Sequence, residues 1–313
     1  MEIERLKRVL KGVCVVMITP FDEKLNVDID SLRRQVRFIV DNGIKEGRGV
    51  IISTGSTGEC PMLTIEERKK ILEVIVEEAR GEVPIIAGCN HTSTLKVIEL
   101  VKHAESVGAS GAMISPPYYW APTEEVIIEH YKTIAKATKL GITVYNNHFA
   151  SQVDIPLSVL KKLIEIDNIV GFKENTPLIS KLIQVVKEIG DKVNVINGSG
   201  ERNEPFASFI GVKGVVSALA NFAPKTALSM YEAESRGDYE KAKKIHSDLM
   251  PLFKTIWWRK DGDSSRYISY VKEAMKMMGI ISHSNVRPPI LPLKEEERQK
   301  LEKALKAVGF LKE

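Results

Sequence analysis

The feature that most constrains the fold of this chain is an alternation, repeated eight times, of a short β-branched run and a longer amphipathic run. The short runs are nearly continuous in apolar residues, which predicts buried strands, and the longer runs have helical spacing. The predicted strands are Gly12–Thr19, Gly49–Ser53, Val83–Gly88, Gly111–Ser115, Ile142–Asn146, Ile169–Lys173, Val193–Ile196 and Gly214–Ser217. The predicted helices between and after them are Asp30–Asp41, Thr64–Ala79, Ser93–Val107, Thr123–Thr138, Pro156–Ile166, Pro177–Ile189, Glu204–Ile210 and Pro224–Ser235.

Strands that alternate with helices form a parallel sheet covered by helices. Eight such units fit a closed (β/α)8 TIM barrel, the predicted fold class. An open doubly wound sheet is less favoured, because no GxGxxG turn follows the first strand. After Asp238 the pattern changes to three predicted helices, Tyr239–Lys254, Ser265–Met278 and Lys294–Val308. We therefore predict a catalytic barrel over residues 1–235 and a C-terminal three-helix segment over residues 236–313.

Two details of this C-terminal segment lead to further expectations. Lys272 and Lys276 are four residues apart in the second of its helices and are expected to line an exposed face. Of the adjacent Trp257 and Trp258, one is expected to pack on the barrel and the other to cover the mouth of the site or a subunit interface.

The composition argues against several classes of function. The 45 basic and 41 acidic residues give a net charge of only +4, which provides no case for nucleic-acid binding. The longest apolar runs are strand-sized, so we expect no membrane span, and an N-terminus that carries acids predicts a cytoplasmic protein. Cys14, Cys60 and Cys89 lack CxxC spacing, which argues against a disulfide framework and against a zinc site.

In a TIM barrel the reacting groups lie at the C-terminal ends of the strands. This rule selects Lys173 and Tyr145 together with small polar loops, and it selects no His, Asp and Glu cluster with metal-ligand spacing. Burial favours the neutral form of an amine, and a neutral amine attacks ketones to form an imine. A tyrosine hydroxyl can then move the proton. For Lys173 alone, a strand-end lysine that reaches solvent beside a surface Glu174 is the simpler alternative.

The loop Gly55-Ser56-Thr57-Gly58 follows a strand and precedes a helix. Its backbone N–H groups are candidates to hold a substrate carboxylate. A plain strand-to-helix turn, with glycines chosen for their φ angles, is the alternative for this loop.

Six short motifs occur together in one order. They are Ile18-Thr19-Pro20-Phe21, Gly55-Ser56-Thr57-Gly58-Glu59, Pro117-Tyr118-Tyr119, Tyr145-Asn146, Gly171-Phe172-Lys173-Glu174 and Val286-Arg287-Pro288-Pro289. In order and spacing the chain resembles the dihydrodipicolinate synthase / N-acetylneuraminate lyase family of class I aldolases, from about Gly12 to Leu293. The resemblance implies a TIM barrel with C-terminal helices, usually a homotetramer built as a dimer of dimers. It implies a 2-oxo acid substrate and neither a metal nor an organic cofactor, since the lysine supplies the electron sink.

The resemblance also implies roles for individual residues. Lys173 would form the Schiff base with pyruvate or another 2-oxo acid, and Tyr145 would act as the acid and base at the imine. Thr57, with the N–H groups of the loop that contains Gly55 and Gly58, would bind the carboxylate of the 2-oxo acid.

Three further roles follow from the same comparison. Ser56 would link Tyr145 to Tyr119, and Tyr119 would reach the site of a neighbouring subunit. The backbone carbonyl near Val216 would face the nucleophilic end of the bound ketoacid.

The chain departs from the family pattern after the catalytic tyrosine. His148 stands in place of a proline. It is either a specificity residue or an extra acid/base, or a loop histidine with a local hydrogen bond. Ala150 stands where the synthases of the family have an arginine for the carboxylate of the aldehyde partner, and Trp120 replaces a common asparagine. A small residue at Ala150 resembles the aldolases or dehydratases of 2-keto-3-deoxy sugar acids.

Three functions follow as hypotheses. The first is a Schiff-base lyase that acts on pyruvate or a 2-keto-3-deoxy sugar acid, by forming or cleaving a carbon–carbon bond or by dehydration. The second is a dihydrodipicolinate synthase that condenses pyruvate with aspartate semialdehyde, in which Arg202 or Arg259 replaces the missing arginine. The third is a 2-oxo acid binding protein without enzymatic activity, which the intact Lys173, Tyr145 and Thr57 argue against.

Overall fold

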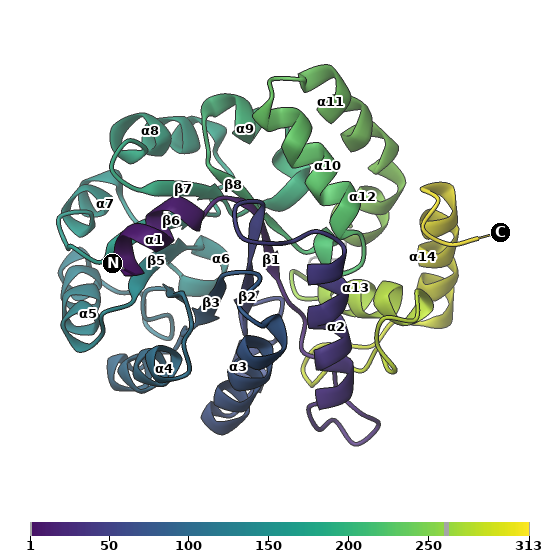
Figure 1. Cartoon of the computed structure of the whole chain (residues 1–313), viewed down its shortest axis with the longest axis horizontal. Coiled ribbons are helices and arrows are strands. Elements are labelled where there is room, and N and C mark those ends of the chain that lie inside the picture. The colour runs from purple at the N-terminus through teal and green to yellow at the C-terminus, as the bar shows by residue number, and fades with distance from the viewer. Residues whose placement is uncertain (1, 260–262, 313) are drawn as a thin grey trace.

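The computed structural model describes residues 2–259 and 263–312. Eight parallel strands form a closed barrel in chain order, each hydrogen-bonded to the next and β8 to β1 (Figure 1). They are β1 (Gly12–Val16), β2 (Gly49–Ser53), β3 (Ile85–Gly88), β4 (Gly111–Ile114), β5 (Gly141–Asn146), β6 (Ile169–Glu174), β7 (Asn194–Asn197) and β8 (Gly214–Ser217). The predicted fold class is thus confirmed.

Helices surround the barrel on all sides (Figure 1). They are α2 (Ile29–Asp41), α3 (Ile65–Ala79), α4 (Thr94–Ser106), α5 (Glu124–Ala137), α6 (His148–Ser151), α7 (Leu157–Leu163), α8 (Ile179–Ile189), α9 (Phe206–Ile210) and α10 (Pro224–Ser235). Three short 3-10 turns lie beside strand ends, η1 (Cys60–Met62), η2 (Gly200–Asn203) and η3 (Leu219–Asn221). Helix α3 begins with the expected capping box between Thr64 and Glu67.

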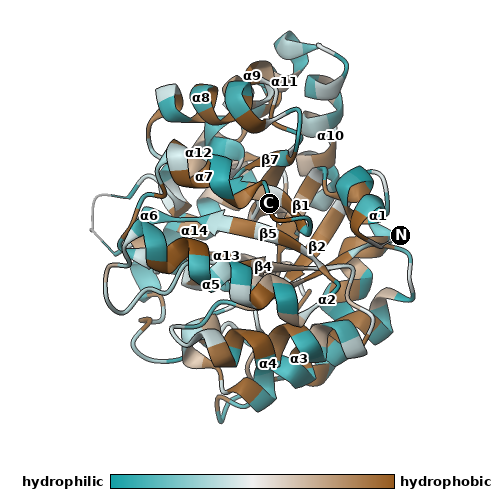
Figure 2. Cartoon of the chain, turned by 90° about the vertical axis from the view of Figure 1, so that its left-hand side faces the viewer, coloured by the Kyte–Doolittle hydropathy of each residue, from teal (hydrophilic) through white to brown (hydrophobic). Residues whose placement is uncertain are grey.

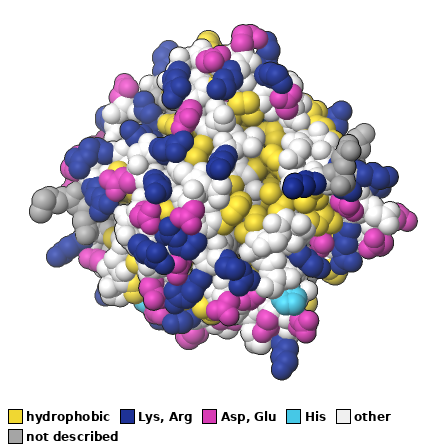
Figure 3. Space-filling view, turned by 45° about the vertical axis from the view of Figure 1, so that its right-hand side comes forward, with side chains coloured by type: hydrophobic (Ala, Val, Ile, Leu, Met, Phe, Trp, Pro, Cys, Tyr) yellow, Lys and Arg dark blue, Asp and Glu magenta, His cyan; other side chains and the backbone are white. Residues whose placement is uncertain are grey.

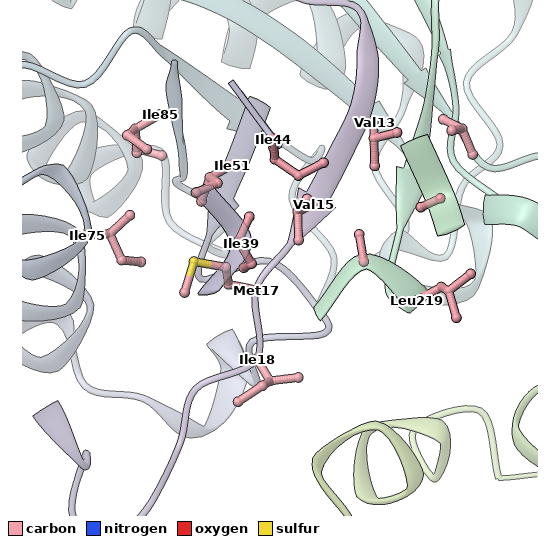
Figure 4. Packing of buried hydrophobic residues seen from close by; sticks show 14 of the residues in the cluster. Val13, Val15, Met17, Ile18, Ile39, Ile44, Ile51, Ile75, Ile85 and Leu219 are labelled. Atoms are coloured by element: carbon pink, nitrogen blue, oxygen red, sulfur yellow. The ribbon is translucent and has the colours of Figure 1, made fainter. Parts of the chain in front are cut away.

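The apolar core has two layers because side chains alternate along each strand. Residues that face outward from the strands pack against the helices, and Figure 4 shows part of this layer around Val13, Val15 and Ile51. Residues that face inward, such as Cys14 and Val16, fill the barrel itself. In Figure 2 the strands are accordingly hydrophobic, and the helices are hydrophilic on their outer faces.

An N-terminal helix that the sequence analysis did not predict, α1 (Glu2–Val9), lies over β5 and β6 (Figure 1). Its Leu6 and Val9, together with Leu10, are buried in the same cluster as the inward-facing strand residues. Helix α1 therefore covers the barrel end opposite to the strand tips that carry Tyr145 and Lys173.

The C-terminal segment corrects one prediction, because it contains four described helices and not three. They are α11 (Tyr239–Asp248), α12 (Met250–Ile256), α13 (Tyr267–Met277) and α14 (Glu295–Ala307). The predicted helix Tyr239–Lys254 is interrupted at Leu249, since Pro251 has no N–H to continue the helical hydrogen bonds. The division into residues 1–235 and 236–313 stays a prediction.

The outer surface carries charges of both signs. Figure 3 shows basic and acidic side chains interspersed over one face, with hydrophobic side chains gathered near its middle. Within residues 2–259 and 263–312, no helix is both long and apolar enough to cross a lipid bilayer.

Three buried acids form a cluster between the barrel and α10. Glu201, Glu204 and Glu234 are each at most 3% exposed. Burial raises the pKa of Glu201 to about 7, and burial together with the charges of Glu204 and Glu201 raises that of Glu234. The Oε1 atom of Glu234 has no hydrogen-bond partner among the described residues.

Replacing Glu234 with glutamine is expected to stabilise the protein at pH 8 by about 1–3 kcal/mol. In the wild type, the folded state keeps a proton that the unfolded state releases above its ordinary pKa of 4.5. The free energy of unfolding therefore falls as the pH rises from the ordinary pKa of 4.5 to the raised pKa values of the folded state. Glutamine mimics the protonated acid and removes the part of this pH dependence that Glu234 contributes, while Glu201 and Glu204 keep theirs.

Urea unfolding between about pH 5 and 8 measures this effect, with Glu23→Gln on an exposed loop as the control. If the free energy of unfolding of Glu234→Gln changed with pH as much as that of the wild type, the Glu234 carboxyl would ionise without cost in the folded state.

Candidate active site

Lys173 and Tyr145 lie side by side at the C-terminal ends of β6 and β5. They are paired in the strand register, so both side chains point to the inside of the barrel. The two side chains are 4% exposed, and the Nζ atom of Lys173 lies 3.8 Å from the centre of the Tyr145 ring. No carboxylate of the described residues lies within ion-pair distance of Lys173. A buried ammonium without a counter-ion is costly, which indicates a functional reason for its position.

The neighbouring Asn146 and Glu174 face outward and hold the two strand ends together. The Nδ2 atom of Asn146 donates hydrogen bonds to Glu174 at 2.9 Å and to Asp154 at 2.8 Å, and its Oδ1 atom accepts from the Ile155 N–H. Glu174 is 2% exposed, and burial raises its pKa to about 7. The simple alternative of a surface glutamate beside a solvated lysine is therefore wrong.

The hydroxyl of Tyr145 has a partner that the sequence analysis missed. The Nδ2 atom of Asn147 donates a hydrogen bond of 2.6 Å to the Tyr145 hydroxyl oxygen. The Oδ1 atom of Asn147 accepts from the Phe149 N–H and from Asn175, which fixes the orientation of the amide. With its oxygen engaged as an acceptor, Tyr145 keeps its own proton for another group.

The loop after β2 forms the opposite wall. A Cβ atom on Gly55 would lie 2.8 Å from Val16 Cγ1, and one on Gly58 would lie 2.9 Å from the Met17 carbonyl oxygen, so larger residues do not fit. The N–H groups of Gly58 and Glu59 donate to the carbonyls of Gly55 and Ser56. The N–H groups of Ser56 and Thr57 donate to no backbone carbonyl that the structure describes, and they remain available to an anion.

The C-terminal helix α13 contacts this loop at two points. The hydroxyls of Thr57 and Tyr267 are 2.8 Å apart and hydrogen-bonded. Lys272 forms an ion pair with Glu59, and both side chains are fully buried. The prediction that Lys272 lines an exposed face is therefore wrong, because the helix presents this lysine to the carboxylate of Glu59, whereas Lys276 is exposed as expected.

A cavity of about 560 Å³ joins these groups. Six residues that the sequence analysis proposed for the site line it, namely Lys173, Tyr145, Ser56, Thr57, Val216 and Ala150. Its size exceeds the need of a three-carbon acid, which leaves room for a second reactant.

Four other proposed residues do not line this cavity. Gly55 and Gly58 are buried behind its wall. Tyr119 is 70% exposed and contacts Trp120, and the ring of His148 lies 3.8 Å from that of Phe149. His148, which stands in place of the family's proline, is the first residue of the short helix α6, and Asn147 is the N-cap of this helix.

The far side of the cavity is formed by residues that the barrel pattern does not select. Glu201 and Arg202 come from η2, and Trp257 and Arg259 follow α12. Both Trp257 and the adjacent Trp258 contact the Phe253 ring, and Trp258 is 44% exposed. The described residues contain no group of three His, Cys, Asp or Glu side chains that could hold a metal ion.

Comparison with known proteins identifies the family of this chain. The model of the Dihydrodipicolinate synthetase family matches residues 9–308. The 4-hydroxy-tetrahydrodipicolinate synthase of Methanocaldococcus jannaschii is 35% identical over 302 residues, 96% of this chain and 99% of the relative. The enzyme of the same name from Aquifex aeolicus is 34% identical over 297 residues, 95% of this chain and 97% of the relative.

A crystal structure with bound pyruvate, the chloride-inhibited dihydrodipicolinate synthase from Acinetobacter baumannii, superposes with a TM-score of 0.88 at 31% identity. The superposition covers 96% of this chain and 100% of the Acinetobacter baumannii chain. The chain is therefore a member of the dihydrodipicolinate synthetase family, whose enzymes are class I lyases that work through a Schiff base.

Proposed function

We propose that this enzyme is a Schiff-base lyase that acts on pyruvate or on a 2-keto-3-deoxy sugar acid through Lys173. The observation that supports this proposal most directly is the buried side chain of Lys173, which lines the cavity with its Nζ atom beside the Tyr145 ring. The amine would attack the ketone carbon, and water would leave as the imine forms. The protonated imine would then accept the electron pair of the carbon–carbon bond that breaks. In a dehydration it would accept the pair of a carbon–hydrogen bond, and the hydroxyl would leave with a proton as water.

The surrounding groups suit the other steps of this reaction. Thr57 and the free N–H groups at Ser56 and Thr57 would hold the carboxylate of the 2-oxo acid. Tyr145, whose oxygen accepts from Asn147, would give and take the proton. The Val216 carbonyl would face the carbon that becomes nucleophilic, as the family resemblance implies.

Trapping with borohydride tests the proposal. Reduction of the imine formed with pyruvate would leave a stable secondary amine, which peptide mass spectrometry maps to one lysine. An adduct on Lys173 would support the proposed chemistry. An intact protein that gives no adduct with pyruvate or with larger 2-oxo acids would contradict it.

Replacing Tyr145 with phenylalanine is expected to lower turnover by about a hundredfold or more, the scale of a lost general acid/base. The ring that contacts Lys173 remains, so binding of the 2-oxo acid should change little. Steady-state kinetics measures both, with Tyr239→Phe outside the cavity as the control. Unchanged turnover would mean that another group moves the proton.

The relay from Tyr145 through Ser56 to Tyr119 remains part of the proposal in an assembled enzyme. Within the single chain the Tyr145 oxygen is paired with Asn147, and Tyr119 is exposed. An exposed tyrosine at this place suits insertion into a neighbouring subunit. His148 and Ala150 lie on the same short helix, and Ala150 would leave room for the second substrate.

The second candidate function is 4-hydroxy-tetrahydrodipicolinate synthase, which condenses pyruvate with aspartate semialdehyde. The names of the relatives favour it. Ala150 argues against it, since a methyl group cannot bind the carboxylate of that aldehyde. The third hypothesis, a non-enzymatic binder, loses its basis because the chain belongs to a family of lyases.

Assembly as a homotetramer is proposed from two exposed apolar groups. One consists of Leu178, Ile179, Ile183, Phe206 and Phe209 on α8 and α9 and the residue that precedes α8. The other consists of Tyr119, Trp120 and Phe149 near the cavity. Groups of exposed large apolar side chains are typical of subunit interfaces.

The proposed location is the cytoplasm, which three free, buried cysteines suit. The proposed reaction needs no metal or organic cofactor, because the Lys173 imine is the electron sink.

A further inference from the structure

Arg202 is, like Lys173, a cation of the cavity that forms no ion pair with an acid among the described residues. It lies on η2, directly after the loop that follows β7, and it lines the same cavity as Lys173. Its Nε atom donates to the backbone carbonyl of Ser199 at 3.2 Å, which anchors the side chain. The two terminal nitrogens donate to no group of the described residues. Burial lowers the pKa of Arg202, as expected for a desolvated guanidinium without an ion-pair partner.

The neighbouring acid does not fill this role. Glu201 hydrogen-bonds to the Ser217 hydroxyl and forms no ion pair with Arg202. Burial raises the pKa of Glu201 to about 7, so the carboxyl is largely protonated below neutrality. The positive charge of Arg202 is therefore left for a ligand.

The other arginine of the cavity, Arg259, has different surroundings. Its guanidinium donates to the backbone carbonyls of Ile256 and Asp263 and lies 5.1 Å from the centre of the Tyr270 ring. These contacts hold the chain after α12, and they engage the donors that a substrate would need. Of the two arginines considered as replacements for the missing one, the geometry selects Arg202.

Tyr267 connects the Arg202 side of the cavity to the carboxylate loop. The Tyr267 hydroxyl is hydrogen-bonded to that of Thr57. Burial raises the pKa of Tyr267, and the positive charge of Arg202 opposes this increase. Arg202, Tyr267 and the reacting Lys173 line the same cavity.

We propose that Arg202 binds an anionic end group of the second substrate, a carboxylate or a phosphate at the end remote from the imine. An arginine forms paired, charge-assisted hydrogen bonds with either group. The inference rests on the proposed function, because it names the class of substrate that meets the pyruvate imine. The substrate would then be an aldehyde that carries a negative charge, or the 2-oxo acid that such a condensation yields.

Substrate preference tests this inference. Pyruvate consumption is measured with succinic semialdehyde, glyceraldehyde 3-phosphate and uncharged glyceraldehyde, which separate a carboxylate, a phosphate and a neutral acceptor. Arg202→Gln is expected to raise KM for the preferred charged aldehyde about 10- to 100-fold, the scale of a hydrogen bond to a charged group. KM for glyceraldehyde should stay within about twofold, and Arg202→Lys should recover part of the loss.

A binding measurement makes the test independent of turnover. Calorimetry measures succinate and inorganic phosphate binding to the untreated and to the pyruvate-trapped enzyme, for wild type, Arg202→Gln and the surface control Arg236→Gln. Loss of binding of either anion in Arg202→Gln alone would support the inference. Neither anion binding to the wild type, equal affinities in the three proteins, or a wild-type preference for glyceraldehyde would overturn it.

The two proposals fail in different ways. Absence of a pyruvate adduct in the wild type would contradict the Schiff-base chemistry, even if an anion still bound in an Arg202-dependent manner. A normal adduct with anion binding that ignores Arg202 would contradict only the inference about the second substrate.

Discussion

Replacing Lys173 with alanine is expected to abolish the borohydride-trapped adduct and to lower turnover at least about a thousandfold. The imine requires a primary amine at this place. The other lysines are not candidates, since none of them lines the cavity in the part of the chain that the structure describes. Lys276→Ala, on the exposed face of α13, should keep both the adduct and the activity.

The same substitution should not weaken the fold. The ammonium of Lys173 is buried against the Tyr145 ring without a carboxylate within ion-pair distance among the described residues. Removing an unpaired buried charge removes a cost of folding. Thermal unfolding of Lys173→Ala should therefore occur at the wild-type temperature or above it. An adduct that persists elsewhere, or a variant that loses its structure together with its activity, would contradict the assigned role.

Replacing Lys272 with methionine is expected to lower the free energy of unfolding by about 3–5 kcal/mol, the cost of leaving one member of a buried ion pair alone. Both Lys272 and Glu59 are 0% exposed. Lys272 also donates to the Asn285 carbonyl at 2.8 Å and lies 4.1 Å from the centre of the Phe21 ring. Methionine keeps the apolar stem of the side chain but leaves the Glu59 carboxylate without its cation.

The change should also reach the active site. Glu59 has a φ angle of 58°, a left-handed conformation that a non-glycine residue holds only where its surroundings enforce it. Its other carboxylate oxygen accepts from the Arg287 N–H at 2.9 Å. Because Thr57 lies two residues earlier, a loosened Glu59 should raise KM for pyruvate by about tenfold, which corresponds to about 1.4 kcal/mol.

Urea unfolding and pyruvate kinetics measure these two effects, with Lys276→Met one turn further along the same helix as the control. The double variant Lys272→Met, Glu59→Gln should regain most of the lost stability, because no unpaired charge remains buried. A loss below about 1 kcal/mol in Lys272→Met would place the ion pair among those that contribute little.

Much of the fold was predictable because it depends on local patterns. The period of each strand and helix is present in its own residues, and the capping box at Thr64 fixes a helix start within four positions. The boundary errors have local causes too. The helix break at Leu249 depends on Pro251. Helix α1, which was not predicted, is short, and its stability comes from the packing of Leu6 and Val9 at the barrel end.

The candidate site was predictable only in part. The strand-end rule and the family motifs select Lys173, Tyr145 and Thr57, and the structure brings these together around one cavity. Asn147 was not selected because its side chain contacts Tyr145 only after the chain turns into α6. Tyr267 was missed for a stronger reason, since 210 residues separate it from Thr57 and no periodicity relates a C-terminal helix to a barrel loop.

The sequence by itself determined the barrel, its strand order and the lysine at the tip of β6, because each depends on patterns within a few residues or on motifs in register. The tertiary structure decided which side chains are paired. It buried Lys272 against Glu59 and placed Tyr267 on Thr57, and it left Arg202 without an ion-pair partner among the described residues. Pairing of this kind depends on contacts between segments far apart in the chain, and the charge of a residue alone does not reveal whether folding brings it a partner.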